Sequence, residues 1–471
     1  MNRTFIHFLI ILIICTPFVA ADTDPALTTK LDHDLSTYAS NGATYVARVV
    51  DVSTGRELYL HDPDRPVAPA SNAKLPNLAA GLDRFGPDYA WKTYLAVDGD
   101  NLWLIGTGDP SCGDRRIALS HNQKQMAILD DFADALLQHG ITHLKGKLLF
   151  DDSIFDDQRV GASWPKSELT EYWSAPLTGL SLCDSCIQVT ASTSRVEILP
   201  QSPSIKIIDH TRTTGKPEPL SIDRAPDSNT FTITGLLTKE DQIEQKAITD
   251  PGFFFADALR ARLAEKGITI DGPTERSAHP LADPHIIATH QTLMLDVLKR
   301  IGKQSQNLFA DALCKLQGRA WDLDHNIHQP GNWDSGTKAI HDFLKRMQID
   351  DSQYIAVDGS GLSSDNRVTA RLLSDVLLKM LHHRYAKEYE QSLSICGVDG
   401  TLDDRMMDIT GLVHGKSGTI DGVKALSGYL TTRTGQRLVF SMVFNNIPPK
   451  YEHRCADIMD NACRIMVDWK P

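Results

Sequence analysis

The sequence contains no dense run of lysine or arginine, and its 60 acidic residues outnumber its 48 lysines and arginines, which leaves a formal net charge of −12. A protein that binds nucleic acid usually presents a basic face to the phosphates. The charge pattern therefore disfavours nucleic acid as a partner. With 41% hydrophobic and 23% charged residues the composition is that of a globular protein, and 471 residues are enough for two or three domains.

Long apolar runs are also missing beyond the N-terminus. The N-terminus has the three parts of a secretory signal peptide: the basic residue Arg3, an apolar segment at 5–15 and small residues at 19–21 (VAA). The apolar segment is too short for a retained membrane anchor, and the bulky Ile14 before Cys15 disfavours lipidation. We expect residues 1–21 to be removed, which leaves a periplasmic or otherwise extracytoplasmic protein without a stable membrane anchor.

Cysteines are few, and their spacing does not complete a zinc motif. Of the eight cysteines, Cys15 lies in the predicted signal peptide, so an odd number remains. Cys183 and Cys186 form a C-x-x-C pair, but no second C-x-x-C or H-x-x-x-H follows it. They form either a local disulfide or two loop thiols. Cys455 and Cys463 lie about 12 Å apart along an expected helix, too far to bond to each other.

The motif that organises the chain is S-x-x-K at Ser71–Lys74. At the start of a helix this spacing places the hydroxyl and the amine on one face, about one turn apart. A serine hydroxyl needs a base beside it to act as a nucleophile, and an amine can serve when a dry pocket or another cation lowers its pKa. The same spacing also occurs at 163–166 and at 335–338.

Periodicity predicts a mixture of helices and strands. We expect strands at 44–50 and 57–61, a helix from residue 71 that Pro76 kinks or widens, a hairpin at 93–97 and 102–105, and a strand at 144–151. Short alternating stretches fill 187–234. Further helices are expected near 128–136, 253–266, 292–303, 308–316, 335–347 and 451–469, with a strand headed by 416–419 and a hairpin at 428–432 and 437–444.

Two later motifs accompany Ser71. S-x-N occurs at Ser305–Asn307, between two expected helices, and the single K-S-G of the chain begins at Lys416. A rival S-x-N at 364–366 trails a glycine-rich loop, so we prefer Ser305. The ordered set S-x-x-K, S-x-N, K-S-G resembles the signature of the penicillin-recognising serine acyl-transferases.

Four further segments narrow the resemblance: 106–110 (GTGDP), 172–176 (YWSAP), 358–363 (DGSGLS) and 397–402 (GVDGTL). Together they resemble the DacB-type D-alanyl-D-alanine carboxypeptidases, peptidase family S13. This resemblance implies an α/β (α+β) fold: a β-lactamase/transpeptidase-like domain from 22–90 and 288–471, interrupted by an inserted α/β domain at 91–287. A small β-rich subdomain at about 165–235 is nested in the insertion.

The resemblance also implies roles for individual residues. Ser71 is the acylated nucleophile and Lys74 its proton acceptor, while Ser305 relays a proton to the leaving amine. The other implied site residues bind substrate or supply charge: Asn307, Lys416, Ser417, Gly418, Thr419 and Asp151. The backbone N–H groups of Ser71 and Thr419 are expected to form the oxyanion hole. No cofactor or metal is required.

The implied activity is that of a serine-type D-Ala-D-Ala carboxypeptidase, a DD-endopeptidase, or both. Peptidoglycan peptides are the expected substrates, β-lactams the expected acylating inhibitors, and a homo-oligomer is possible. Two alternatives share the fold: a serine β-lactamase-like hydrolase, which the long insertion disfavours, and a non-catalytic peptidoglycan-binding protein, which the retained Ser71 and Lys74 disfavour. Residues 364–365 (SD) and Asp421 depart from the pattern of members that bind diaminopimelate, so side-chain specificity stays open.

Overall fold

The computed structural model describes residues 23–37, 42–225 and 227–471. The predicted signal peptide at 1–21 lies outside the described residues. Across the part of the chain that the structure describes, every helix is too short or too polar to cross a bilayer.

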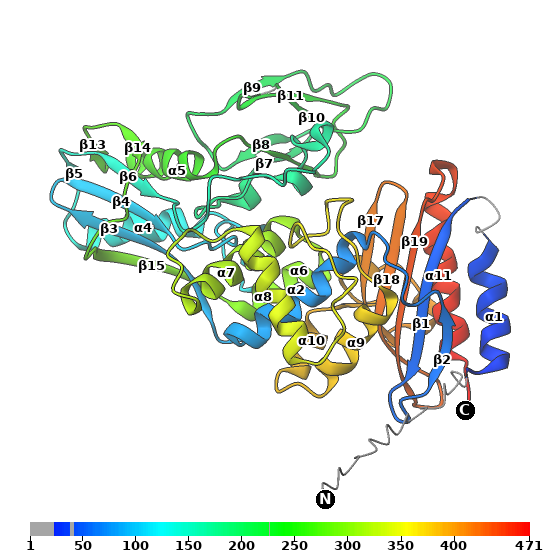
Figure 1. The fold of residues 1–471 in the computed structure, drawn as a ribbon. Coiled ribbons are helices and arrows are strands. Elements are labelled where there is room, and N and C mark those ends of the chain that lie inside the picture. The colour runs from blue at the N-terminus through cyan, green and yellow to red at the C-terminus, as the bar shows by residue number, and fades with distance from the viewer. Residues whose placement is uncertain (1–22, 38–41, 226) are drawn as a thin grey trace, which may run out of the picture.

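A six-stranded antiparallel sheet forms the centre of the larger part of the molecule, in the order β16-β17-β18-β19-β1-β2 (Figure 1). β1 pairs with β19 along its whole length, from Thr44 opposite Asn445 to Asp51 opposite Leu438. The two ends of the chain therefore meet inside one sheet. Its strands are β1 (Thr44–Asp51), β2 (Glu57–His61), β16 (Ser394–Ile395), β17 (Val413–Ile420), β18 (Val423–Thr431) and β19 (Arg437–Asn445).

Helices cover both faces of this sheet. α1 (Pro25–Leu35) and α11 (Glu452–Val467) pack on one face, where Leu31, Phe440 and Met459 belong to one buried apolar cluster. Burial on both sides explains why β19 reads as a nearly continuous apolar run rather than an alternating one. The helices of the other face are α2 (Lys74–Phe85), α6 (Met294–Lys303), α7 (Asn307–Asp324), α8 (Trp333–Arg346), α9 (Ala370–Leu381) and α10 (Ala386–Gln391).

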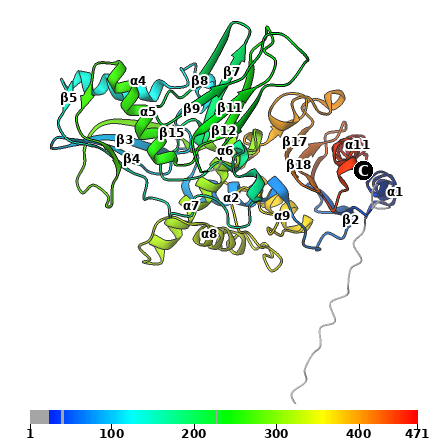
Figure 2. The same cartoon turned by 90° about the horizontal axis from the view of Figure 1, so that it is seen from above.

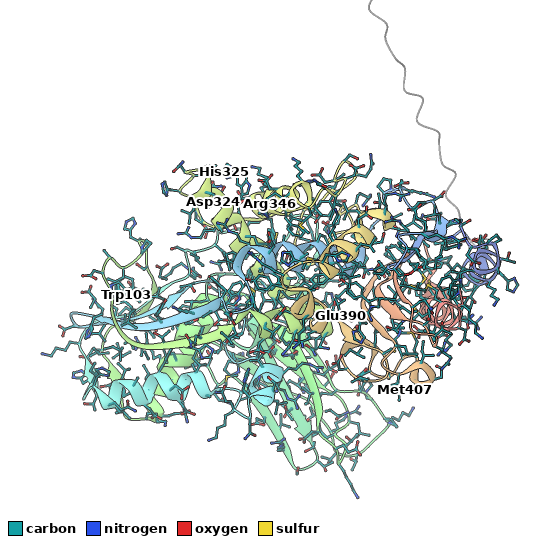
Figure 3. All side chains as sticks on the ribbon, turned by 90° about the horizontal axis from the view of Figure 1, so that it is seen from below. Trp103, Asp324, His325, Arg346, Glu390 and Met407 are labelled. Carbon is teal, nitrogen blue, oxygen red and sulfur yellow. The ribbon has the colours of Figure 1, made fainter. Side chains whose placement is uncertain are left out.

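Between α2 and α6 the chain forms a second, five-stranded sheet in the order β14-β6-β4-β3-β15. The first and the last of these strands along the chain, β3 and β15, are neighbours in the sheet, with Ala90 opposite Leu293. The segment therefore leaves and rejoins the larger part of the molecule at one place. It extends away from the first sheet (Figure 2), and Trp103 of β4 and Met407 lie at opposite ends of the molecule (Figure 3). The strands are β3 (Ala90–Asp98), β4 (Asn101–Gly106), β6 (Leu148–Asp151), β14 (Thr274–Arg276) and β15 (His285–Leu293).

Helices α4 (Ala127–Gln138) and α5 (Pro251–Glu265) pack on this sheet, and α3 (Arg115–Ser120) precedes them. Asp250 caps α5 by accepting a hydrogen bond from the backbone N–H of Phe253, and Pro251 occupies the first turn, where it leaves no hydrogen bond unmade. A parallel pair, β5 (His143–Leu144) and β13 (Thr269–Ile270), extends the end of this layer.

A β-rich subdomain projects from the insertion as two three-stranded sheets. One has the order β12-β7-β8 and the other β10-β11-β9. Because β12 pairs with β7, we propose to draw the end of this subdomain after residue 247 rather than near 235. The strands are β7 (Cys186–Ser192), β8 (Arg195–Leu199), β9 (Lys206–Asp209), β10 (Ser221–Arg224), β11 (Thr230–Thr234) and β12 (Gln242–Ala247).

The structure corrects several predicted elements. Residues 70–73 form a 3-10 turn and α2 begins at Lys74, so Pro76 lies in the first turn and α2 needs no kink there. The strand predicted at 144–151 is divided into β5 and β6, and 416–419 lies within β17 rather than at its head. The helix predicted from 292 begins at Met294, after β15. All cysteines of the described residues are free thiols.

Candidate active site

Ser71 lies in the 3-10 turn Ala70–Ala73, at the junction between the six-stranded sheet and α2. Ala70 has a left-handed backbone, with φ of 47°, a conformation that costs energy in a residue with a Cβ atom. Gly361 of the glycine-rich loop lies against the carbonyl of Ala70, and any side chain at that position would collide with it. The loop at 358–363 therefore supports the turn that presents Ser71.

Lys74 is fully buried and reaches three oxygen atoms. Its Nζ lies 3.0 Å from Ser71 Oγ, 2.7 Å from Asn307 Oδ1 and 2.5 Å from the carbonyl oxygen of Ser360. A neutral amine has two N–H groups and one lone pair. If the two N–H groups bind the Asn307 and Ser360 oxygens, the lone pair faces the hydroxyl of Ser71 and can accept its proton.

The pKa of Lys74 is lowered to about 8, because burial disfavours the ammonium form. The carboxylates of Asp311 and Asp358 oppose this shift by attracting the charge. Burial also raises the pKa of Asp311 to about 7, with a further contribution from Asp358. Lys74 is thus a base whose protonation changes close to neutral pH.

Ser305 and Lys416 form the second pair of the site. Ser305 has a left-handed backbone with φ of 60°, and its Oγ accepts a 2.8 Å hydrogen bond from Lys416 Nζ. Lys416 is fully buried in β17, and burial together with the charge of Lys74 lowers its pKa well below the usual range. Because this repulsion is mutual, the two amines resist carrying two charges at once.

Asn307 is the first residue of α7 and connects Lys74 to the inserted segment. Its Oδ1 accepts from Lys74, and its Nδ2 donates a 2.8 Å hydrogen bond to the carbonyl of Trp173. Since Trp173 lies in the insertion, that segment fixes which way the amide of Asn307 points.

Gly418 lets β17 run directly beside the nucleophile. A Cβ atom at this position would lie 3.0 Å from the backbone N of Ser71 and 3.1 Å from the carbonyl of Pro69, tighter than ordinary contacts. On either side of it, Ser417 Oγ lies 2.7 Å from Thr401 Oγ1 and Thr419 is exposed to the cleft. Ser71 and Thr419 thus line the same cleft.

The S-x-N turn is held from behind by a buried charged cluster. Gln306 donates a 3.1 Å hydrogen bond to Asp184, and Arg300 contacts Asp114 at 2.7 Å and Asp184 at 3.4 Å. Burial, together with the neighbouring Asp114, raises the pKa of Asp184 to about 8, against the effect of Arg300. Asp184 belongs to the insertion, so this cluster joins the insertion to the catalytic motif.

A cleft of about 760 Å³ opens over Ser71, Ser305, Asn307 and Thr419. Both signs of charge occur on its walls, with Arg116 and Arg300 on the insertion and α6 sides and acidic residues elsewhere. The acidic residues that line it are Glu168, Asp421 and Glu452.

Asp151 is the one predicted site residue that the structure does not bring to this cleft. It ends β6, is 7% exposed, and its Oδ1 accepts a hydrogen bond from the backbone N–H of Ser153. Lys74, Lys416, Ser417 and Gly418 do not line the cleft either, but each contacts a residue that does, whereas the hydrogen bond described for the Asp151 side chain goes to Ser153, outside the cleft. The side chain of Asp151 instead stabilises the turn that follows β6.

The side chains of the rival motifs make local contacts. Ser163 shares a 2.6 Å hydrogen bond with Ser363, and Ser335 donates to Asp322 at 2.8 Å inside the first turn of α8. In the rival S-x-N, Asn366 is buried and donates to Asp358 in the glycine-rich loop. Each of these three side chains is therefore held by a neighbouring hydroxyl or carboxylate, unlike Ser71, which contacts an amine.

Sequence reasoning missed two groups at the site: the carbonyl of Ser360 and the carboxylate of Asp311. Asp311 accepts hydrogen bonds from Trp333 Nε1 at 2.9 Å and from the backbone N–H of Gly359 at 2.8 Å. The DGSGLS string marked the loop, but a carbonyl acceptor has no sequence signature. Asp311 lies four residues after Asn307, on the same face of α7, which is a signal that the sequence does contain.

Several known proteins are similar to this chain in sequence. The model of the D-Ala-D-Ala carboxypeptidase 3 (S13) family matches residues 27–465. A D-alanyl-D-alanine carboxypeptidase of an Actinomadura species is 30% identical over 90% of this chain and 82% of its own length. The D-alanyl-D-alanine carboxypeptidase DacB of Haemophilus influenzae is 25% identical over 74% of this chain and 72% of its own.

Solved structures match the fold over almost the whole chain. Penicillin-binding protein 4 of Haemophilus influenzae superimposes with a TM-score of 0.75 at 22% identity, covering 94% of this chain and 99% of that one. A predatory peptidoglycan endopeptidase of Bdellovibrio bacteriovorus gives a TM-score of 0.52 at 16% identity, covering 90% and 92%. These matches confirm the predicted α+β fold of the β-lactamase/transpeptidase type.

Fold and sequence together define a D-Ala-D-Ala carboxypeptidase. The chain belongs to the D-Ala-D-Ala carboxypeptidase 3 (S13) family. It is a hydrolase, a serine-type D-Ala-D-Ala carboxypeptidase, as the resemblance of its motifs predicted.

Proposed function

We propose that the chain cleaves D-Ala-D-Ala bonds and peptide cross-links of peptidoglycan through an acyl-enzyme on Ser71, outside the cytoplasm. The observation that carries the proposal is the 3.0 Å contact between Ser71 Oγ and the buried Nζ of Lys74, beside Ser305 and Asn307. An amine in that position can take the proton of Ser71 as Oγ attacks the carbonyl carbon.

The negative charge that develops on the carbonyl oxygen needs donors already in place. The backbone N–H groups of Ser71 and Thr419 border the cleft on the side of the nucleophile, where removal of one such donor typically costs about 3 kcal/mol of transition-state stabilisation. Ser305, held by Lys416, passes a proton to the departing amine. Water then releases the acyl group from Ser71.

The terminal carboxylate of the substrate affects the protonation of Lys416 and, through it, that of Lys74. Lys416, Ser417 and Thr419 lie in β17, of which Thr419 lines the cleft and Lys416 contacts Ser305, another lining residue. An anion bound beside Lys416 favours its protonated form. A charged Lys416 then disfavours a charge on Lys74. Substrate binding thus shifts the lysine pair toward the protonation state in which Lys74 acts as a base.

The location and the partners are inferred from the same chemistry. A signal peptide at 1–21 would deliver the chain to the compartment that contains peptidoglycan, and the related Haemophilus influenzae protein is described in complex with a β-lactam. A β-lactam carries a strained amide and a carboxylate, so it meets the same groups as the peptide. We infer that penicillins acylate Ser71.

Labelling with benzylpenicillin tests this proposal. Mass spectrometry of the labelled protein should locate one penicilloyl group on Ser71. Ser71→Ala should lose the label and still unfold as the parent does, while the matched variants Ser163→Ala and Ser335→Ala should keep it. A label on another serine would overturn the assignment.

A serine β-lactamase is the alternative, since the same acyl-enzyme would form on Ser71. The two activities differ in the fate of that acyl-enzyme. The proposal expects release of D-alanine from peptides that end in D-Ala-D-Ala and loss of the penicilloyl group over minutes or longer. Fast penicillin turnover without D-alanine release and without cross-link cleavage would favour the β-lactamase.

A further inference from the structure

Asp109, Cys112 and His290 bring a carboxylate, a thiol and an imidazole together at a distance from the catalytic motifs. One ligand atom from each lies within 4.8 Å of the other two. Asp109 and Cys112 belong to the loop that follows β4, and His290 lies in β15. None of the three lines the catalytic cleft.

The five-stranded sheet brings these three residues together. His290 is paired with Thr93 of β3, and paired residues of antiparallel strands point their side chains to the same face. Thr93 Oγ1 lies 3.4 Å from Cys112 Sγ, so the loop after β4 passes over that face. Asp109 and Cys112 of the loop and the distant His290 therefore share one side of the sheet.

Two of the three side chains have a buried polar atom without a partner. Asp109 is 1% exposed; its Oδ1 accepts from the backbone N–H of Ser111 at 2.9 Å and from its hydroxyl at 2.6 Å, yet Oδ2 has no hydrogen-bond partner among the described residues. The same holds, within those residues, for Nε2 of His290. Buried polar atoms are rarely left unpaired, because their lost hydration is then not replaced by a hydrogen bond.

We propose that Asp109, Cys112 and His290 bind a divalent transition-metal ion, with Zn²⁺ as the ion that best fits the ligand set. Zn²⁺ accepts nitrogen and oxygen at about 2.0–2.2 Å and thiolate sulfur at about 2.3 Å, so two of its ligands lie at most about 4.5 Å apart. Small side-chain movements close the three atoms on one ion. Mg²⁺ and Ca²⁺ prefer oxygen ligands and fit the thiol poorly.

The surroundings supply the remaining requirements of such a site. Ser111 holds one oxygen of Asp109 and so turns the other toward the ion, as outer ligands of metal sites do. A cavity of about 210 Å³ lined by Ser111, His290 and Thr292 gives access for the ion and for water as a fourth ligand.

The ion would act as a brace rather than as a catalyst. It would join the loop after β4 to β15, and β15 runs directly into α6, which ends two residues before Ser305. Metal binding would therefore stabilise the inserted sheet and its connection to the S-x-N turn.

Titration of the chelator-treated chain with Zn²⁺ in a calorimeter tests the proposal. We expect one ion per chain and a rise in the unfolding temperature when the ion is present. Co²⁺ serves as a second probe, because a cysteine ligand adds a thiolate-to-cobalt charge-transfer absorption. Cys112→Ser should remove that absorption, and Cys112→Ser and His290→Gln should each lower the affinity about 100-fold or more.

Matched variants separate this site from adventitious binding. Cys463→Ser, at a buried cysteine of α11, and His279→Gln, at an exposed histidine, should bind like the parent chain. His290 is only half-buried, so His290→Gln decides the matter if Cys112→Ser fails to fold, and acylation by benzylpenicillin reports that each variant is folded. The absence of stoichiometric binding, or binding that His290→Gln leaves unchanged, would overturn the proposal.

Discussion

Lys74 lies in a pocket where burial and two carboxylates act on its pKa in opposite directions. Burial lowers the pKa of Lys74 to about 8, while Asp311 and Asp358 raise it. The active base is the neutral amine, so kcat/KM for peptide cleavage should rise about tenfold per pH unit below pH 8 and level off above it. A carboxylate that binds beside Lys416 should move the inflection of kcat to a lower pH than that of kcat/KM.

Asp311→Asn tests whether the carboxylate of Asp311 raises the pKa of Lys74 against the effect of burial. Asparagine keeps an oxygen that can accept from Trp333 and Gly359 but removes the negative charge, so the pKa of Lys74 should fall further. The inflection of kcat/KM should therefore move to lower pH by about one unit. Asp342→Asn, at a partly buried carboxylate that accepts from Trp321, is the matched control and should leave the profile unchanged. A shift to higher pH would contradict this role of Asp311.

At this scale motif order predicted which side chains lie together better than it predicted their surroundings. Ser71, Lys74, Ser305, Asn307 and Lys416 were all found from motif order, and they meet around one cleft. The acceptors that orient Lys74 come partly from backbone carbonyls, which any residue type can supply. Asp151 is a residue that a motif position suggested but that the structure does not bring to the cleft.

At the scale of single elements, β17 is shaped by the need to pass close to the nucleophile. Gly418→Ala would place a methyl group 3.0 Å from the backbone N of Ser71 and push the strand away from the oxyanion donors. We expect penicillin acylation to slow at least about tenfold, with a much smaller change in stability, because one displaced donor can cost about 3 kcal/mol.

Gly415→Ala is the control for this change. Gly415 lies in the same strand on the opposite face, and its nearest neighbours would lie 3.3 Å from the added methyl group, one of them the flexible side-chain end of Leu426. Rates of acylation measured by stopped-flow should separate the two variants. Equal rates for both would show that close packing at Gly418 is not what positions the oxyanion donors.

Periodicity located α2, α4, α5, α6, α8 and α11 to within a few residues, ended α7 too early and missed α1, α3, α9 and α10. The errors have physical causes. Residues 285–293 contain β-branched Ile and Thr, but their apolar and polar residues do not alternate, so the strand has no clear period-two signal. The 3-10 turn at Ala70–Ala73 is set by contacts with β17 and the glycine-rich loop. Such long-range contacts have no local signal.

At the scale of the whole molecule, the cluster of Asp114, Asp184 and Arg300 joins the insertion to α6. The pKa of Asp184 is raised to about 8 in the folded chain, so between about pH 4 and pH 8 the folded state holds a proton that the unfolded state has released. The stability therefore falls as the pH rises from about 4 to about 8, at a slope of up to about 1.4 kcal/mol per pH unit, and this dependence ends above pH 8.

Asp184→Asn keeps a neutral group of the same shape and cannot release a proton. The variant should therefore lose less stability than the parent chain between pH 5 and pH 8, as measured by the midpoint of urea unfolding. Asp98→Asn, at the exposed last residue of β3, should keep the pH dependence of the parent. A parent and an Asp184→Asn variant with equal slopes would show that Asp184 is ionised throughout.

The pairing of β1 with β19 has a consequence for the order in which the molecule can fold. β1 leaves the ribosome early, but its neighbour in the sheet, β19, lies at Arg437–Asn445, so the six-stranded sheet cannot close until nearly the whole chain is available. The insertion, whose ends are paired at Ala90 and Leu293, needs no later residue for its own sheet. The part that holds no nucleophile can thus fold first, and the cleft over Ser71 is assembled last, on a partner that is already rigid.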